Sequence, residues 1–130
     1  DFTSLELSKY NIITALHKFY NVNDYLNYIN KNKQQLNPDY FMVSTGISDN
    51  DFINLENILK QVNCKFICID IANGYIENFQ IFCKKVRSIY PNKIILAGNV
   101  CTAEGVEALI NCDIDIIKIG IGLCFFFVII

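Results

Sequence analysis

Five apolar runs recur along the chain, each separated from the next by a longer stretch of mixed polar and apolar residues. The runs lie at residues 12–16, 41–45, 66–71, 94–97 and 116–121. Most of them are continuous rather than alternating, which is typical of short strands that are covered on both faces, as in parallel sheets. The pattern therefore predicts five buried parallel strands.

The stretches between these runs have the spacing of amphipathic helices. Ser48 is placed to cap one helix, and Asp51 follows at the position of a capping-box acid. Thr102 is placed to cap another, and Pro91 ends a helix that begins near Tyr75. The apolar stripes expected on these helices are Phe52, Leu55, Leu59 and Val62; Tyr75, Phe79, Phe82, Val86 and Ile89; and Val106, Leu109 and Ile110. A weaker helix is expected at about residues 23–33, and the end of another at 2–9.

This order of elements predicts an α/β fold of repeated strand–helix units, because parallel strands need a crossover of about this length. Polar residues or glycines follow every run. They are Lys18, Gly46, Asp70 with Gly74, Gly98 with Asn99, and Gly120 with Gly122. Since ligands bind at the carboxyl ends of parallel strands in such folds, we expect a single one-sided site there.

Asp70 is the most informative of these residues because it places a charge at the end of a β-branched run. Burying a carboxylate is costly unless something binds it. Two interpretations stay open from the residue alone: Asp70 holds a ligand hydroxyl or amide, or backbone N–H groups satisfy it within a loop. Lys18 is likewise either a phosphate contact or a surface charge. Exposed backbone expected at residues 98–99 and 120–122 would offer carbonyl or N–H groups to an ion.

Composition narrows the class of protein. The net charge is −2 and the basic residues are scattered, with Lys84 and Lys85 expected on a solvated helix face, which argues against nucleic-acid binding. Six cysteines without a CxxC pair, together with a single histidine, argue against a zinc site. Several cysteines lie in apolar runs, as reduced thiols do in the cytoplasm. The apolar end, residues 121–130, is shorter than the roughly 20 residues that a membrane span needs.

Four segments, taken in order, resemble the IMP dehydrogenase/GMP reductase superfamily, and the first two resemble its GMP reductase branch. They are Thr14-Ala-Leu-His-Lys-Phe-Tyr20, Phe66-Ile-Cys-Ile-Asp-Ile-Ala-Asn-Gly-Tyr75, Ala97-Gly-Asn-Val100 followed by Thr102, and Asp115-Ile-Ile-Lys-Ile-Gly-Ile-Gly122. The resemblance implies that residues 1–122 form part of a TIM (β/α)8 barrel, about units two to six. It also implies NADPH-dependent reductive deamination of GMP to IMP and ammonia in purine salvage, by a cytoplasmic homotetramer.

The resemblance also implies roles for individual residues. Lys18, Asp70, Ile71, Ala72, Ile119 and Gly120 match NADPH-contacting positions, and Gly120 and Gly122 match carbonyl donors to a potassium ion. In the family, a cysteine a few residues after this Gly-x-Gly attacks C2 of the purine, and hydride then arrives from the nicotinamide.

After Gly122 the chain departs from the family, which continues Pro-Gly-Ser, one residue, and Cys-Thr-Thr. Here Leu123 and Cys124 are followed by six apolar residues, so the nucleophile is not carried over to Cys124 and no catalytic residue is assigned. Residues 123–130 are interpreted as an aberrant apolar tail that is prone to aggregation.

Three hypotheses follow. The chain is an incomplete GMP reductase without activity, an IMP dehydrogenase-type oxidoreductase, or a non-catalytic fragment that binds a nucleotide or pairs with a full-length subunit. Asn73-Gly74-Tyr75 speaks against the second hypothesis.

Overall fold

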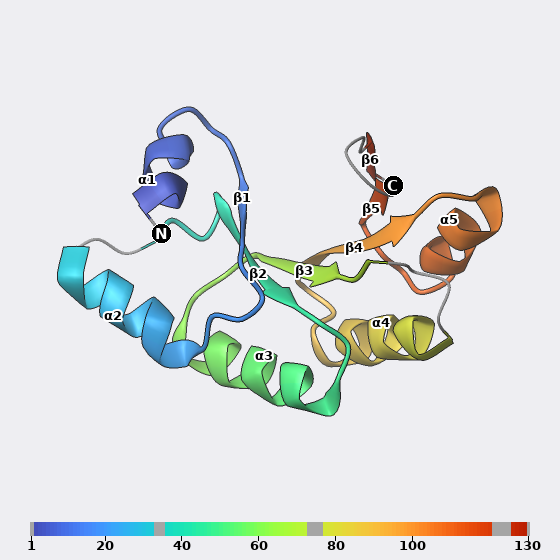
Figure 1. Ribbon diagram of the computed structural model, residues 1–130, viewed down its shortest axis with the longest axis horizontal. Helices are drawn as coiled ribbons and strands as arrows, with labels where there is room; N and C mark the ends of the chain where they lie inside the picture. Colours follow the sequence, from blue (N-terminus) through green and yellow to red (C-terminus); the bar gives the residue numbers. More distant parts are fainter. Residues whose placement is uncertain (1, 33–35, 73–76, 121–125, 130) are drawn as a thin grey trace. The chain divides into compact units, whose positions relative to one another are not determined.

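The structure, a computed structural model, describes residues 2–32, 36–72, 77–120 and 126–129. The chain divides into two compact units, residues 1–67 and 68–130. Strand β3 (Phe66–Asp70) begins in the first unit and ends in the second. Strands and helices alternate along the chain from β1 to β5, as the sequence predicts (Figure 1).

The N-terminal unit contains two parallel strands and three helices. The elements are α1 (Phe2–Ser8), β1 (Thr14–Leu16), α2 (Val22–Asn32), β2 (Phe41–Thr45) and α3 (Asp49–Gln61). Thr14 lies opposite Phe41, and Leu16 lies opposite Val43. Every residue of β2 is buried, which confirms the prediction of a strand covered on both faces. Helix α3 packs against β2 and α2 (Figure 1).

Strand β1 is shorter than the apolar run that predicted it. The run begins at Ile12, but Ile12 and Ile13 are exposed and the strand starts at Thr14. At this point the backbone is still hydrogen-bonded to the end of α1, because the Ile12 N–H donates to the Leu7 carbonyl at 3.2 Å. Asn11 adopts a positive φ of 58°, which closes this turn before the strand can begin.

Helix α3 begins with the predicted capping box. The Asp51 N–H donates to Ser48 Oγ at 3.1 Å, and the Ser48 N–H donates to the Asp51 carboxylate at 2.9 Å. The helix buries Phe52, Leu55 and Ile58, whereas the expected Leu59 is only half-buried. The apolar stripe is therefore turned by one residue in the second half of the helix.

Replacing Ser48 with alanine should lower the free energy of unfolding by about 1 kcal/mol, because an N–H at the start of the helix loses its acceptor. Urea denaturation measures this change. Ser48→Thr keeps the hydroxyl and serves as the control. An alanine variant as stable as the threonine variant would show that the box does not hold the helix start.

The C-terminal unit contains the end of β3 and five further elements. They are α4 (Glu77–Ile89), β4 (Ile94–Val100), α5 (Ala103–Ile110), β5 (Ile116–Ile119) and β6 (Phe126–Ile129). Strands β4 and β5 are parallel, and Ala97 lies opposite Ile117. The α4 residues Phe79, Phe82 and Val86 are buried as predicted, whereas Ile89 is exposed and Tyr75 lies outside the described residues. Thr102 caps α5 as predicted, since its hydroxyl accepts the Gly105 N–H.

Strand β6 is an element that the sequence pattern did not predict. Within residues 123–130, which the sequence analysis interpreted as an aberrant apolar tail, residues 126–129 pair with β5 in the antiparallel direction, with Phe126 opposite Ile119. Only six residues separate the end of β5 from the start of β6, which is too few for the helical crossover that joins parallel strands.

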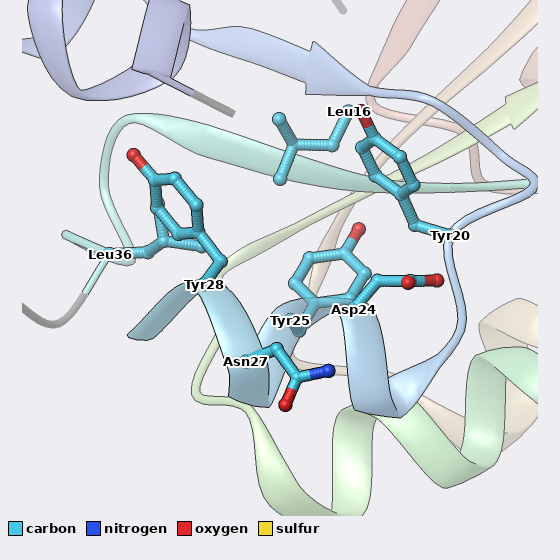
Figure 2. Close-up of a pocket in the computed structure, with 7 residues that line it drawn as sticks. All are labelled: Leu16, Tyr20, Asp24, Tyr25, Asn27, Tyr28 and Leu36. Carbon is cyan, nitrogen blue, oxygen red and sulfur yellow. The ribbon is translucent and has the colours of Figure 1, made fainter. Parts of the chain in front are cut away.

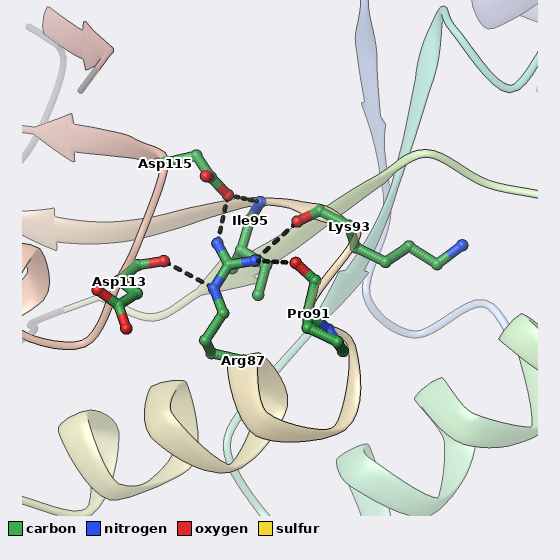
Figure 3. A network of polar contacts seen from close by, with 6 residues as sticks. All are labelled: Arg87, Pro91, Lys93, Ile95, Asp113 and Asp115. Atoms are coloured by element: carbon green, nitrogen blue, oxygen red, sulfur yellow. Dashed lines mark hydrogen bonds and ion pairs between the residues drawn. The ribbon is translucent and has the colours of Figure 1, made fainter.

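Arg87, near the end of α4, ties together the chain segments that lead into β4 and β5 (Figure 3). Its guanidinium donates to the carbonyl oxygens of Asp113 (2.7 Å), Lys93 (2.9 Å) and Pro91 (3.3 Å) and to the Asp115 carboxylate. The same carboxylate accepts the Ile95 N–H at 2.7 Å. A single half-buried side chain therefore fixes the starts of two neighbouring strands.

Candidate functional site

Three strand ends meet in the C-terminal unit through backbone hydrogen bonds. The Ile71 N–H donates to the Gly98 carbonyl at 2.9 Å, and the Asn99 N–H donates back to the Ile71 carbonyl at 2.9 Å. The Gly120 N–H donates to the Val100 carbonyl at 2.8 Å. These bonds join the carboxyl ends of β3, β4 and β5 into one surface, which we call the strand-end cluster: Asp70, Ile71, Gly98, Asn99, Lys118 and Gly120.

Asp70 forms an ion pair with Lys118 across the cluster. Lys118 Nζ lies 3.3 Å from Asp70 Oδ1, and the two side chains are 21% and 40% exposed. To the two interpretations of Asp70 the structure therefore adds a third: a neighbouring lysine holds the carboxylate in place. Lys118 is a residue that the sequence analysis missed. The one available signal was a charge in the middle of an otherwise apolar strand.

Gly98 allows Lys118 to approach. A Cβ atom added at Gly98 would lie 2.5 Å from the Lys118 carbonyl oxygen and 2.7 Å from the Lys118 Cβ. Gly98 lies opposite Lys118, and the strand register shifts between Gly98 and Val100, so Asn99 forms a bulge. The prediction of exposed backbone at residues 98–99 was wrong, because both residues are buried and hydrogen-bonded to Ile71.

Asn99 brings a buried acceptor to the cluster. Asn99 is 8% exposed, and its Oδ1 atom has no hydrogen-bond partner in the described part of the chain. A buried acceptor without a donor is costly, so it marks a position where a ligand N–H or O–H would be stabilised. The sequence analysis placed Asn99 at a strand end but assigned a ligand role to its backbone and not to its side chain.

The other residues of the predicted cofactor site are distributed as follows. Ile71 and Ile119 are half-buried, and Ala72 is exposed. Gly120 has a φ of 131°, a conformation that L side chains rarely adopt. Of the two predicted potassium donors, the Gly120 carbonyl belongs to the described chain, and Gly122, like Gly74, lies outside it. A carbonyl oxygen is the donor type that a hard monovalent cation prefers.

Lys18 lies in the N-terminal unit, in the loop that follows β1. It is half-buried, and its ammonium lies 5.8 Å from the centroid of the Phe19 ring. Phe19 is 74% exposed and packs on His17, with ring centroids 4.9 Å apart. His17 Nδ1 accepts the Phe19 N–H at 3.3 Å, so a neighbouring backbone group satisfies this histidine.

Most of the cysteines within the described residues are buried, and none of them forms a disulfide. Cys64, Cys68, Cys83 and Cys112 are buried, and Cys101 is exposed. Burial raises the pKa of the Cys83 thiol, and burial also raises the pKa of Cys112. No group of three metal-ligating side chains occurs in the part of the chain that the structure describes. Nor does any helix there combine the length and hydropathy needed to cross a membrane.

The sequence is similar to those of known proteins over most of its length. The sequence profile of the IMP dehydrogenase / GMP reductase domain matches residues 3–124. A GMP reductase from Buchnera aphidicola subsp. Schizaphis graminum is 47% identical over 117 residues, which is 89% of this chain and 33% of that protein. A GMP reductase from Tolumonas auensis is 44% identical over the same coverage. The chain therefore spans about a third of the length of these curated relatives.

The fold is also that of a solved relative. The crystal structure of inosine 5′-monophosphate dehydrogenase from Legionella pneumophila superposes with a TM-score of 0.68 at 30% identity, covering 83% of this chain and 32% of that one. The predicted fold class is confirmed: five parallel strands with intervening helices form part of a (β/α)8 barrel.

Proposed function

Because the chain belongs to the IMP dehydrogenase / GMP reductase family, we propose that it takes part in the reductive deamination of GMP. In this reaction GMP, NADPH and a proton give IMP, NADP⁺ and ammonia. The sequence relatives at 44% and 47% identity are both GMP reductases, which favours this reaction over IMP oxidation. Among the described residues, four cysteines are buried and none forms a disulfide, which fits a cytoplasmic enzyme.

The strand-end cluster is the observation that supports a cofactor role most strongly. NADPH would supply the hydride. Asp70 is a carboxylate acceptor suited to a ribose hydroxyl or a carboxamide N–H, and its ion pair with Lys118 limits the orientations it can take. Asn99 Oδ1 adds a second, buried acceptor for a ligand donor. The backbone around residues 71–72 and 119–120 would complete the contacts.

Binding of NADPH is favoured when the contacting side chains are already in position before the cofactor arrives. The strand ends hold the charged pair and the buried amide in this way. A potassium ion held by the carbonyl oxygens of Gly120 and Gly122 belongs to the same proposal.

We further propose that this chain alone does not turn over GMP. The family's cysteine follows Gly122 by five residues, and Phe127 stands at that position here. Phenylalanine has no nucleophilic atom, so no covalent bond to C2 of the purine can form from this position. Removing a covalent nucleophile usually costs orders of magnitude in rate.

The test uses the purified 130-residue chain and follows the fluorescence of reduced nicotinamide. We expect saturable binding of NADPH and no GMP-dependent oxidation of it. Absence of saturable binding would overturn the cofactor role of the cluster, and IMP formed from GMP would overturn the proposed inactivity. NADH in place of NADPH reports whether the 2′-phosphate contributes.

Lys118→Met should weaken NADPH binding by about tenfold, equivalent to about 1.4 kcal/mol, because Asp70 loses the charge that orients it. The same fluorescence titration measures the change. Lys118→Arg should restore most of the affinity. Lys84→Met, on an exposed position of α4, is the matched control. Equal weakening in the methionine and arginine variants, with circular dichroism unchanged, would show that the charge at this position is not what binds the cofactor.

A further inference from the structure

The N-terminal unit contains a pocket of about 320 Å³ between α2 and the segment that follows β1 (Figure 2). Two leucines, Leu16 and Leu36, form its apolar part. The rest of the lining is aromatic or polar: Tyr20, Asp24, Tyr25, Asn27 and Tyr28. This volume is at the lower end of the roughly 300–1,000 Å³ that is usual for ligand pockets. None of these residues belongs to the strand-end cluster, so a role for the pocket is independent of the proposed function.

Three tyrosine rings surround the space. Tyr25 is only 3% exposed, and Tyr20 meets it edge to face with ring centroids 6.3 Å apart. Tyr28 comes from the next turn of α2, and Figure 2 shows the rings of Tyr20, Tyr25 and Tyr28 arranged around the space below Leu16. The rings come from two separate elements, the loop after β1 and helix α2, so the fold itself brings them together.

The charge of the lining is negative. Asp24 supplies a carboxylate that is held in place at the start of α2, because Asp24 Oδ2 accepts the Asn21 N–H at 2.8 Å. Among the residues that the structure describes, no lysine, arginine or histidine lines the pocket. Burial, followed by the proximity of Cys64, Tyr20 and Asp24, raises the pKa of the Tyr25 hydroxyl, so this side chain stays neutral.

We infer that this pocket binds a small organic ammonium ion. The faces of aromatic rings attract cations, and cages of several rings are the usual way in which proteins hold alkylated ammonium groups. Asp24 supplies the opposite charge, and the leucines contact the alkyl groups. An anion would meet no positive side chain among the described residues of the lining, and a neutral apolar ligand would leave the carboxylate unused.

The experiment compares two probes of the same shape on the full chain. Choline carries a trimethylammonium group, and 3,3-dimethyl-1-butanol is its neutral isostere. The chain has seven tyrosines and no tryptophan, so the tyrosine ring resonances in NMR spectra report binding directly. We expect choline to shift the resonances of Tyr20 and Tyr28 saturably and to bind about tenfold more tightly than the alcohol, as for a partly desolvated cation over aromatic rings.

Variants separate the charge from the cavity. Asp24→Asn keeps an oxygen that can accept the Asn21 N–H but removes the charge, and it should weaken choline binding about fivefold while leaving the alcohol unaffected. Tyr20→Leu should weaken choline more than the alcohol. Glu107→Gln and Tyr10→Leu change an exposed acid and an exposed tyrosine outside the pocket and should have no effect. Equal affinity for the two probes, an undiminished affinity in Asp24→Asn, or no saturable shift would each overturn the inference.

Discussion

Replacing Arg87 with methionine should lower the free energy of unfolding by about 3 kcal/mol, which is a large fraction of the stability of a small domain. The substitution leaves three carbonyl oxygens and the Asp115 carboxylate without their shared donor. Asp115 also accepts the Ile95 N–H, so the carboxylate would stay half-buried with one bond and no positive charge. Removing one partner of a partly buried ion pair destabilises the protein because the other charge is left partly desolvated and unpaired.

Thermal unfolding followed by circular dichroism measures this effect, and a fall of about 10 °C in Tm is expected. Arg87→Lys keeps the charge but cannot reach several carbonyl groups at once, so it should recover less than half of the loss. Lys84→Met alters an exposed position of the same helix and should change stability by less than about 0.5 kcal/mol. An Arg87 variant that is as stable as the Lys84 variant would show that the network does not hold the strand starts.

Gly98→Ala is expected to have a comparable effect through a different cause. The added methyl group would meet the Lys118 backbone oxygen at 2.5 Å, and a backbone atom cannot rotate away as a side chain can. Strands β4 and β5 must therefore separate locally, which should cost about 3 kcal/mol. Lys118 would move with its backbone, so NADPH binding should fall together with stability.

Gly105→Ala is the matched control for this variant. Gly105 is also buried, but its added Cβ would meet the Val100 side chain at 3.1 Å, a contact that a small shift relieves. Alanine is also favoured over glycine within a helix by about 1 kcal/mol, which offsets that strain. In urea denaturation, the midpoint of Gly105→Ala should therefore stay near that of the parent chain, whereas the midpoint of Gly98→Ala should be clearly lower. Similar midpoints for the two variants would contradict the packing argument.

The strands and the helix starts were predictable because their signals are local. An uninterrupted apolar run such as residues 66–71 predicts a buried strand wherever it occurs, and Ser48 with Asp51 forms a capping box from neighbouring residues alone. The edges of these elements were less predictable. Ile12 and Ile13 belong to an apolar run but lie exposed between the turn that follows α1 and the start of β1, and Asn11 in that turn has a positive φ.

The partners within the candidate site were not predictable, because they depend on how strands align. Lys118 reaches Asp70, 48 residues away, only in the register that places Gly98 opposite Lys118. The bulge at Asn99 shifts that register by one residue, and nothing in the local pattern marks it. Arg87 shows the same limit: it follows the exposed Lys84 and Lys85 on α4, yet its side chain also binds the Asp113 carbonyl and the Asp115 carboxylate, 26 and 28 residues further along the chain.

Strand β6 has a consequence for any assembly that includes this chain. A (β/α)8 barrel grows by adding parallel strands, and the edge of β5 that faces away from β4 is where the next parallel strand would pair. In this chain that edge is taken by β6, which runs the opposite way. A separate polypeptide that carries further barrel units could pair with β5 only after β6 had separated from it. Assembly from two chains would therefore begin with the loss of the β5–β6 pairing and not with the simple addition of a strand.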